Sequence, residues 1–311
     1  MFSYHIDEDA KALFVLLSEE IKFDFEFLNL ITELMEGTVK SPYKEICVNY
    51  GNKLPAFDKM SAAYLYNVLR FFARTNTVFV RKPLSRIFDE KVSHSDSGKF
   101  QKIELEKEIL NQKQQCYIIN NDKGLDKTVQ TLVDFIADHN LILENAKEFL
   151  ITTIGEIFSN AFNHSDEKTA NFMFDIQMDG QDISLLINVT DYGKTIVHNV
   201  QTYQERAFNR KLAGQDCIRW AMESGNTTRR GSGGYGLPTL RDYVSEVSGE
   251  LFIFSGDSVY VLADGIEKIS CSEGIFLGTS ITMKIPLFDM SHAITYSKEQ
   301  NKIISKNLYE I

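Results

Sequence analysis

The sequence predicts an α/β protein in which a small α/β domain, residues 1–120, precedes a larger one, residues 121–290. Three observations predict this class. Strand and helix patterns alternate in the first third of the chain, a β-hairpin pattern stands after the middle, and a glycine-rich loop leads into a helix and a closing strand. Alternating strands and helices are typical of α/β architecture. Residues 291–311 are expected to be a polar C-terminal tail.

The first third of the chain is expected to be a compact mixed domain. Ala10–Met35 has helical periodicity with dense aromatic residues, and Lys59–Arg74 has a second helical pattern. Glu45–Tyr50 and Thr77–Val80 are strand candidates on either side of that second helix. A strand–helix–strand alternation favours parallel pairing of the two strands. The pattern loosely resembles the STAS-like domains that accompany serine-kinase switches.

The middle of the chain predicts a linker, two helices and a hairpin. The polar stretch Lys91–Gly98 is expected to be a loop or linker. Leu125–Asp138 and Leu141–Asn163 have helical patterns. Farther on, Asn171–Met178 and Ile183–Val189 alternate around an Asp-Gly turn, which is a good hairpin signal.

One face of the second of these helices carries polar residues. Glu156, Asn160 and His164 stand four residues apart and therefore project from the same side. A carboxylate one turn before an amide suits a base that activates water beside a magnesium ion, because magnesium takes few protein oxygens besides water and phosphate. The alternative is a solvated helix face. His164 has no cysteine or second histidine at ligand spacing, so a hydrogen bond on the phosphate side is favoured over a metal ligand.

Three further segments follow in order. Asp191 ends the second hairpin strand, where a buried carboxylate would accept a hydrogen bond from an adenine amino group, and Gly193 would let the backbone pass close to the base. The glycine-rich stretch Arg229–Leu237 runs directly into the helical pattern Pro238–Val247. It is either a flexible loop or a helix N-terminus whose backbone N–H groups face an anion. Gly278–Pro286 is expected to be the closing strand.

This order of motifs resembles the GHKL superfamily of ATP-binding domains over roughly Leu143–Leu287. The resemblance implies a two-layer α/β sandwich of the Bergerat type with a mixed sheet, and it implies ATP and Mg²⁺ as ligands. Glu156 then takes the place of the general base, and Asn160 that of the magnesium-binding asparagine. Asp191 takes the place of the aspartate that reads adenine, and Thr279 that of the threonine joined to it through water.

The glycine-rich stretch adds the phosphate loop to this resemblance, because Gly234–Leu237 matches the family's Gly-Leu-Gly-Leu sequence. The preceding Thr-Thr-Arg step would face the terminal phosphates, as in a bacterial group of stand-alone ATP-binding proteins with an extra N-terminal domain. The alternative is that its arginine only solvates the loop. Two positions depart from the family, since Thr195 replaces the second glycine of the first glycine box and Ser232 stands where glycine is common. The expected site comprises Glu156 as catalytic residue, Asn160 as metal ligand, and Asn160, Asn163, His164, Asp191, Gly193, Thr195, Thr228, Arg229, Gly231, Gly233, Gly234, Tyr235, Gly236, Leu237 and Thr279 around the nucleotide.

Composition narrows the class of protein. The net charge is −10 and no long basic run occurs, so a nucleic-acid surface is not favoured. No apolar run reaches membrane-spanning length, and the first residues are acidic where a signal peptide is basic, so a cytoplasmic protein is expected. The four cysteines lack paired spacing, which favours reduced thiols.

Two classes of function stay open at this point. As an enzyme, the chain would hydrolyse ATP or pass its γ-phosphate to a serine or threonine of a protein partner. As a nucleotide-gated interaction module, it would close around ATP or ADP and rearrange its N-terminal domain or a homodimer with little turnover. Glu156 favours catalysis. A P-loop is excluded because Asn188 stands where that motif requires glycine, and a self-contained histidine kinase is disfavoured because no phosphoacceptor histidine motif occurs.

Overall fold

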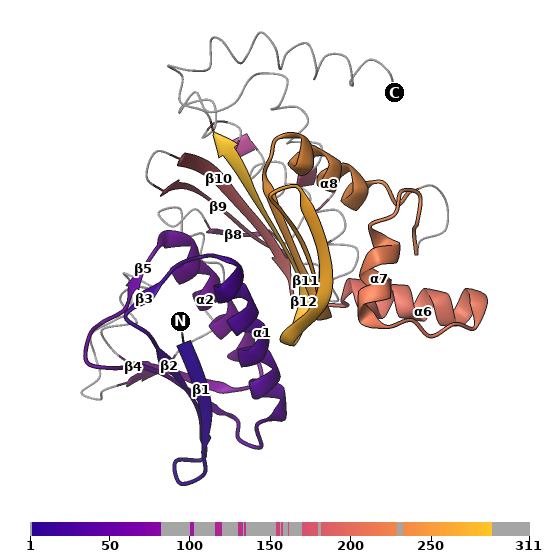
Figure 1. The fold of residues 1–311 in the computed structure, drawn as a ribbon. Helices are drawn as coiled ribbons and strands as arrows, with labels where there is room; N and C mark the ends of the chain where they lie inside the picture. Colours follow the sequence, from indigo (N-terminus) through magenta and orange to yellow (C-terminus); the bar gives the residue numbers. More distant parts are fainter. Residues whose placement is uncertain are drawn as a thin grey trace.

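The computed structural model describes residues 2–81, 100–102, 116–119, 130–132, 134, 154–155, 157, 161, 170–179, 182–228 and 233–287. Within these ranges the chain forms two five-stranded sheets and a two-stranded one, with helices beside and between them (Figure 1). The expected α/β class is confirmed. The polar tail and most of the two helices expected between residues 125 and 163 lie outside the described ranges.

The first sheet is mixed and has the strand order β1-β2-β4-β6-β7. The pairs β2–β4 and β4–β6 are parallel, whereas β1–β2 and β6–β7 are antiparallel. The expected parallel pairing across a strand–helix–strand unit is therefore confirmed for β4, α2 and β6. The bounds of these elements are β1 (Phe2–Asp7), β2 (Ala12–Leu17), β4 (Glu45–Tyr50), α2 (Lys59–Phe72), β6 (Thr77–Arg81) and β7 (Phe100–Lys102).

The expectation of a helical pattern over Ala10–Met35 was wrong in its first half. Residues 12–17 form β2, an inner strand of the sheet, and helix α1 (Phe25–Lys40) begins only after it. A short apolar run such as Ala-Leu-Phe-Val-Leu-Leu fits a buried strand as well as a helix, so periodicity cannot separate the two. The start of α1 is fixed by Asp24, whose side chain accepts a hydrogen bond from the backbone N–H of Phe27 at 2.8 Å.

The second sheet has the order β11-β12-β10-β9-β8, and all of its described pairs are antiparallel. A mixed sheet was expected here. Short hairpin connections force neighbouring strands to run in opposite directions, and both β9–β10 and β11–β12 are hairpins. Strand β8 joins this sheet although it precedes the expected boundary at residue 120. The strands are β8 (Cys116–Ile119), β9 (Ala170–Asp179), β10 (Asp182–Asp191), β11 (Glu250–Ala263) and β12 (Ile266–Leu287).

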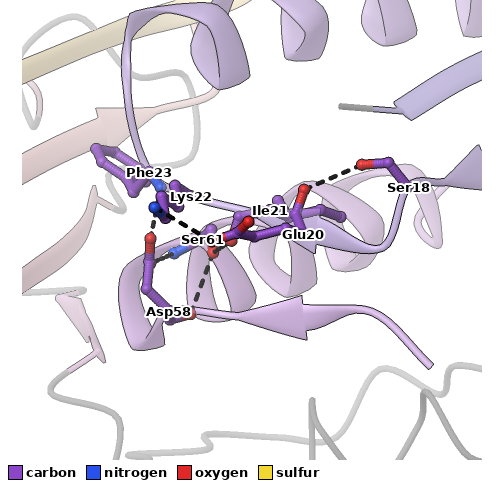
Figure 2. Close-up of polar contacts among 7 residues, drawn as sticks. All are labelled: Ser18, Glu20, Ile21, Lys22, Phe23, Asp58 and Ser61. Carbon is purple, nitrogen blue, oxygen red and sulfur yellow. Dashed lines mark hydrogen bonds and ion pairs between the residues drawn. The ribbon is translucent and has the colours of Figure 1, made fainter. Parts of the chain in front are cut away.

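Helix α2 is fixed at its N-terminus by a polar junction, shown in Figure 2. Asp58 caps the helix by accepting from the backbone N–H of Ser61 at 2.7 Å, and its other carboxylate oxygen accepts from the N–H of Phe23 at 2.6 Å. The Ser61 hydroxyl donates to the carbonyl of Ile21 at 3.0 Å. One side chain therefore holds the start of α2 against the segment that leads into α1. The parallel pair β3 (Glu20–Ile21) and β5 (Ala56–Phe57) lies at the same junction.

An irregular segment of β12 contacts helix α1. Between the pairs Gly256–Phe276 and Ser258–Cys271, β12 has more residues than β11, so the intervening residues leave the ladder. Their free N–H groups find partners on α1, because Glu273 donates to Asn29 Oδ1 at 3.2 Å and Gly274 donates to Thr32 Oγ1 at 3.0 Å. A Cβ at Gly274 would collide with the α1 backbone. This segment needs glycine because it lies directly on the helix.

The second sheet is covered on both faces, by N-terminal helices on one face and by helices of residues 196–246 on the other. Helices α1 and α2 pack on one face and share a hydrophobic core with residues such as Met173, Leu186 and Phe276. Helices α6, α7 and α8 lie on the other face, where a second core includes Leu185, Ile187 and Met283 (Figure 1). Their bounds are α6 (Ile196–Phe208), α7 (Gly214–Ala221) and α8 (Gly236–Glu246). In the described part of the chain, no helix is long and apolar enough to span a membrane.

Candidate functional site

A cavity of about 320 Å³ opens between the second sheet and the helices α6, α7 and α8. Its floor comes from the ends of β10 and β12, its walls from α6 and α7, and its rim from the loop that leads into α8. The lining residues are Ile157, Ala161, Val189, Asp191, Lys194, Ile196, Asn199, Val200, Trp220, Ala221, Asn226, Thr227, Thr228, Gly233, Gly234, Tyr235, Gly236, Leu237, Pro238, Thr279 and Ile281. The size is suitable for a small organic ligand.

One part of this lining is apolar. Val189 and Ile281 form the floor, Val200 comes from α6, and Ile157 and Ala161 are described helical positions within the helix expected over Leu141–Asn163. All five side chains also belong to buried positions of the second core. A flat ring placed here would exchange water for apolar contacts on both faces, which is favourable at roughly 25 cal/mol per Å² of apolar surface.

Asp191 is the one carboxylate among the described residues of this lining. It is the last residue of β10 and is only 4% exposed. Its Oδ1 atom has no hydrogen-bond partner among the described residues, and burial raises its pKa from 3.8 to about 8, against an opposing hydrogen bond from the backbone of Gly193. A buried acceptor without a partner is destabilising unless a ligand or water supplies the donor.

Asp191 is paired in register with Thr279 of β12, so the two residues expected to read the base lie side by side. Thr279 Oγ1 lies 2.9 Å from Ser255 Oγ, and Ser255 Oγ in turn accepts from the N–H of Ile196 at 2.8 Å. Gly278 has φ of 150°, and a Cβ there would collide with the Asp191 carbonyl oxygen. The close approach of the two strands beside the carboxylate therefore requires glycine.

Thr195 has a structural explanation that the sequence alone did not show. It is the N-cap of α6, and its hydroxyl accepts from the N–H of His198 at 2.9 Å. Serine, threonine, aspartate and asparagine are the preferred residues at such a position. Among the described residues, Gly193 lies within the turn between β10 and α6, and Thr195 closes that turn. Threonine therefore stands in place of the second glycine at the position that caps α6.

The two ends of the loop before α8 are held together by a backbone hydrogen bond. Gly225 donates its backbone N–H to the carbonyl of Gly234 at 3.1 Å, and Gly234 has φ of 84°. A Cβ at Gly234 would collide with the carbonyl oxygen of Asn226, whose own side chain donates to the Trp220 carbonyl at 2.9 Å. The two arms of the loop, residues 225–228 and 233–236, therefore run next to each other beside the cavity.

The N-terminus of α8 meets the cavity without an internal cap. Tyr235 is the N-cap residue and makes no side-chain capping bond, and the first turn contains no acidic residue. Gly236, Leu237 and Pro238 of this first turn all line the cavity. The first N–H groups of a helix have no partner within the helix, and the helix dipole makes this end attractive to an anion. Lys194 also lines the cavity and adds a positive charge.

The structure brings together ten of the predicted residues in this region: Asp191, Gly193, Thr195, Thr228, Gly233, Gly234, Tyr235, Gly236, Leu237 and Thr279. Eight of them line the cavity, while Gly193 and Thr195 form the adjoining turn. Six predicted residues lie outside the described ranges, namely Glu156, Asn160, Asn163, His164, Arg229 and Gly231.

Sequence reasoning missed five polar or aromatic residues of the lining: Lys194, Asn199, Trp220, Asn226 and Thr227. Trp220 packs partly against the second core and partly lines the cavity. Asn199 lies one turn after Ile196 on α6, and that helical spacing was the available signal for it. Asn226 and Thr227 immediately precede the predicted residue Thr228, so all three positions of this loop could have been predicted together as lining residues.

The chain matches no protein-family model, and no curated protein sequence matches it. In the ranges that the structure describes, no group of three or more His, Cys, Asp or Glu residues is arranged to hold a metal ion. The chemistry of the cavity is therefore the basis for assigning a function.

Proposed function

We propose that this chain binds an adenine nucleotide, ATP or ADP, in the cavity between the second sheet and helices α6–α8. The single observation that supports it most is Asp191, a buried carboxyl group at the base of a partly apolar cavity, whose Oδ1 has no partner among the described residues. The exocyclic amino group of adenine is a donor on a flat apolar ring, so it fits both properties. Guanine presents a carbonyl oxygen at the same position, so an ionised Asp191 would find no donor there.

The phosphate end of the nucleotide would lie at the N-terminus of α8. Two observations support this orientation. The first turn of α8 lines the cavity without a capping side chain. The hydrogen bond between Gly225 and Gly234 holds the backbone of the preceding loop beside the same part of the cavity. Backbone N–H groups at a helix start are a common phosphate site. Thr228 lies on the same loop and offers a hydroxyl to the phosphates.

The reaction depends on residues that the resemblance assigns. Asn160 would hold Mg²⁺ together with phosphate oxygens, and the ion would neutralise charge on the phosphates. Glu156 would accept a proton from water in hydrolysis, or from a serine or threonine hydroxyl of a protein partner in phosphoryl transfer. The described neighbours Ile157 and Ala161 line the cavity, which supports placing this helix beside the nucleotide.

A second candidate function is a nucleotide-gated interaction module with little turnover. The observation that favours it is the packing of α1 and α2 on the back of the sheet that carries Asp191 and Thr279. A shift of the strands that contact the nucleotide would therefore act directly on α1 and α2, which pack on the same sheet. The two candidates share the binding site and differ only in whether the γ-phosphate is cleaved.

Calorimetric titration of the full chain with ATP, ADP and GTP in the presence of Mg²⁺, at a pH above about 8 where Asp191 is ionised, tests the proposal. Binding of ATP and ADP with at least tenfold weaker binding of GTP is the expected result, since an unpaired buried acceptor costs about 1–3 kcal/mol. Asp191→Asn is the test variant, and Asp216→Asn, on the exposed side of α7, is the matched control. Equal affinity of the wild type for ATP and GTP, or unchanged ATP binding in a folded Asp191→Asn protein, would reject the assignment.

A further inference from the structure

A buried polar cluster lies on β10 and β12 at the face turned away from the cavity. Side chains alternate along a strand, so Val189 and Asp191 face the cavity while Asn188 and Thr190 face the N-terminal layer. On β12 the residues paired with these two are Thr282 and Ser280. All four side chains of this cluster are at most 1% exposed.

Ser280 is the centre of the cluster. Its Oγ lies 2.9 Å from Thr190 Oγ1 and 3.0 Å from Asn188 Nδ2. Asn188 also donates to Thr282 Oγ1 at 2.8 Å and accepts from Thr190 Oγ1 at 2.9 Å. The cluster thus binds together the two strands whose next residues, Asp191 and Thr279, lie at the nucleotide site.

The N-terminal layer reaches this cluster through one hydroxyl. Tyr64 of α2 is fully buried and donates to Ser280 Oγ at 2.9 Å across 216 positions of sequence. Its ring is held by edge contacts with Phe23 and Phe27, at centroid distances of 5.4 and 5.9 Å. The hydroxyl therefore has little freedom to leave its partner without a shift of α2.

A second contact from α2 reaches the residue on the other side of Asp191. The ring of Phe71 stacks on that of Tyr192, with centroids 4.3 Å apart and an angle of 16° between planes. Phe276 of β12 lies on a nearly parallel plane 6.3 Å from Tyr192. Helix α2 thus contacts Tyr192 directly and Thr190 through Ser280, so it holds the backbone on both sides of the carboxylate.

We propose that Tyr64 and Phe71 are positioning residues for Asp191, through which helix α2 of the N-terminal layer sets the selectivity of the cavity for the adenine amino group. This inference rests on the proposed function. Asp191 Oδ1 has no partner among the described residues, and the hydrogen bond to this carboxyl comes from the backbone of Gly193, so its direction follows from the backbone of residues 190–193. A binding group is precise only when its supporting contacts are rigid.

The test compares ATP with inosine triphosphate, which carries a carbonyl oxygen in place of the amino group, at a pH above about 8, where Asp191 is ionised and cannot donate to that oxygen. The wild type should bind ATP more tightly, because a site built for a donor rejects the analogue that lacks it. Tyr64→Phe removes only the hydroxyl, and we expect the ratio of the two affinities to fall about three- to tenfold, the range of one hydrogen bond. The affinity for inosine triphosphate should stay within about twofold of the wild type. Phe71→Leu, which removes the stack on Tyr192, should lower the same ratio.

The matched control is Tyr66→Phe, which removes a hydroxyl from the same helix and should leave the ratio unchanged. Ser280→Ala removes the same hydrogen bond from the sheet side, so it serves if Tyr64→Phe does not fold. In the Asp191→Asn background, Tyr64→Phe should have no further effect on the ratio, because the group that it positions is gone.

The outcomes separate the two hypotheses. Equal loss of affinity for both nucleotides in Tyr64→Phe or Ser280→Ala would show a merely structural contact and overturn the inference. A wild type that discriminates, with both variants discriminating equally well, would overturn it while leaving the proposed function in place. A wild type that binds neither nucleotide would reject the proposed function and the inference together.

Discussion

Proton release on ATP binding is the sharpest consequence of the buried Asp191. In the free protein, burial raises the pKa of this carboxyl from 3.8 to about 8, so the group is mostly protonated at neutral pH. A donor from the adenine amino group favours the ionised form and lowers that pKa again. Below pH 8, ATP binding should therefore expel up to one proton from the site. The affinity should rise with pH by as much as about tenfold per unit between pH 6 and pH 8, and then level off.

Calorimetry in two buffers of different ionisation enthalpy measures the number of protons released at each pH. The γ-phosphate of ATP titrates near the low end of this range, so the matched comparison is with Asp191→Asn, in which only the nucleotide and the remaining protein groups contribute. The difference between the two proteins should approach one proton near pH 7 and vanish well above pH 8. Equal proton release by wild type and Asp191→Asn would refute the argument that this carboxyl is protonated in the free site and ionised in the complex.

The same pKa has a consequence for the stability of the free protein. The unfolded chain ionises Asp191 near pH 4, whereas the fold keeps it neutral to about pH 8. The native state then binds more protons than the unfolded state in this window, so stability falls as pH rises from about 4 to about 8 and is level outside it. Asp191→Asn should remove this slope. The expected gain at pH 8 is up to several kcal/mol, seen as a higher Tm at pH 8 than at pH 4 relative to wild type.

Glu156→Gln should keep ATP affinity within about threefold while lowering turnover a hundred- to ten-thousandfold, and unchanged turnover in a phosphate-release assay would exclude a general base at this position. Arg229→Ala should weaken ATP more than ADP, since a charge-assisted contact to the γ-phosphate has no counterpart in ADP; calorimetry showing equal losses would place the arginine elsewhere. Gly278→Ala should destabilise the fold by more than about 1–3 kcal/mol in urea unfolding, because φ of 150° is unfavourable for alanine and a backbone oxygen occupies the Cβ position. Glu33→Gln should raise the Tm at pH 8 and leave it nearly unchanged at pH 4. A hydrogen bond with Glu273 raises the pKa of Glu33 from 4.5 to about 7, so the folded wild type loses stability as pH rises through this range. The contact is partly exposed, so the gain should be no more than about 1 kcal/mol, and a larger gain at pH 4 than at pH 8 would contradict the assignment.

Several local features of the fold were predictable from the sequence. The hairpin β9–β10 follows from alternating residues around Asp179-Gly180, and β4, α2 and β6 follow from short apolar runs around one amphipathic stretch. Asp191 at a strand end and the glycine loop before α8 follow from the same local reasoning. These features depend on residues close together in the chain, so a single sequence carries enough information to place them.

Long-range packing was beyond that reasoning. The apolar run of β2 has no local signal that separates a strand from a helix, and its parallel neighbour β4 lies about thirty positions later. The packing of α1 on β12 depends on Asn29 and Thr32 meeting the free N–H groups of Glu273 and Gly274. Nothing in either segment alone predicts the other. The covering of the second sheet on both faces is a result of such pairings.

The sequence by itself determined which residues are chemically equipped for a nucleotide, namely a carboxylate at a strand end and glycines before a helix. Only the tertiary structure decided that Asp191 Oδ1 lacks a partner among the described residues, that Thr195 caps a helix, and that Tyr64 reaches Ser280 from a distant layer. The physical reason is that a residue type fixes what a side chain can donate or accept, whereas burial, register and packing fix whether a partner is present. Those conditions arise only when segments far apart in the chain are brought together.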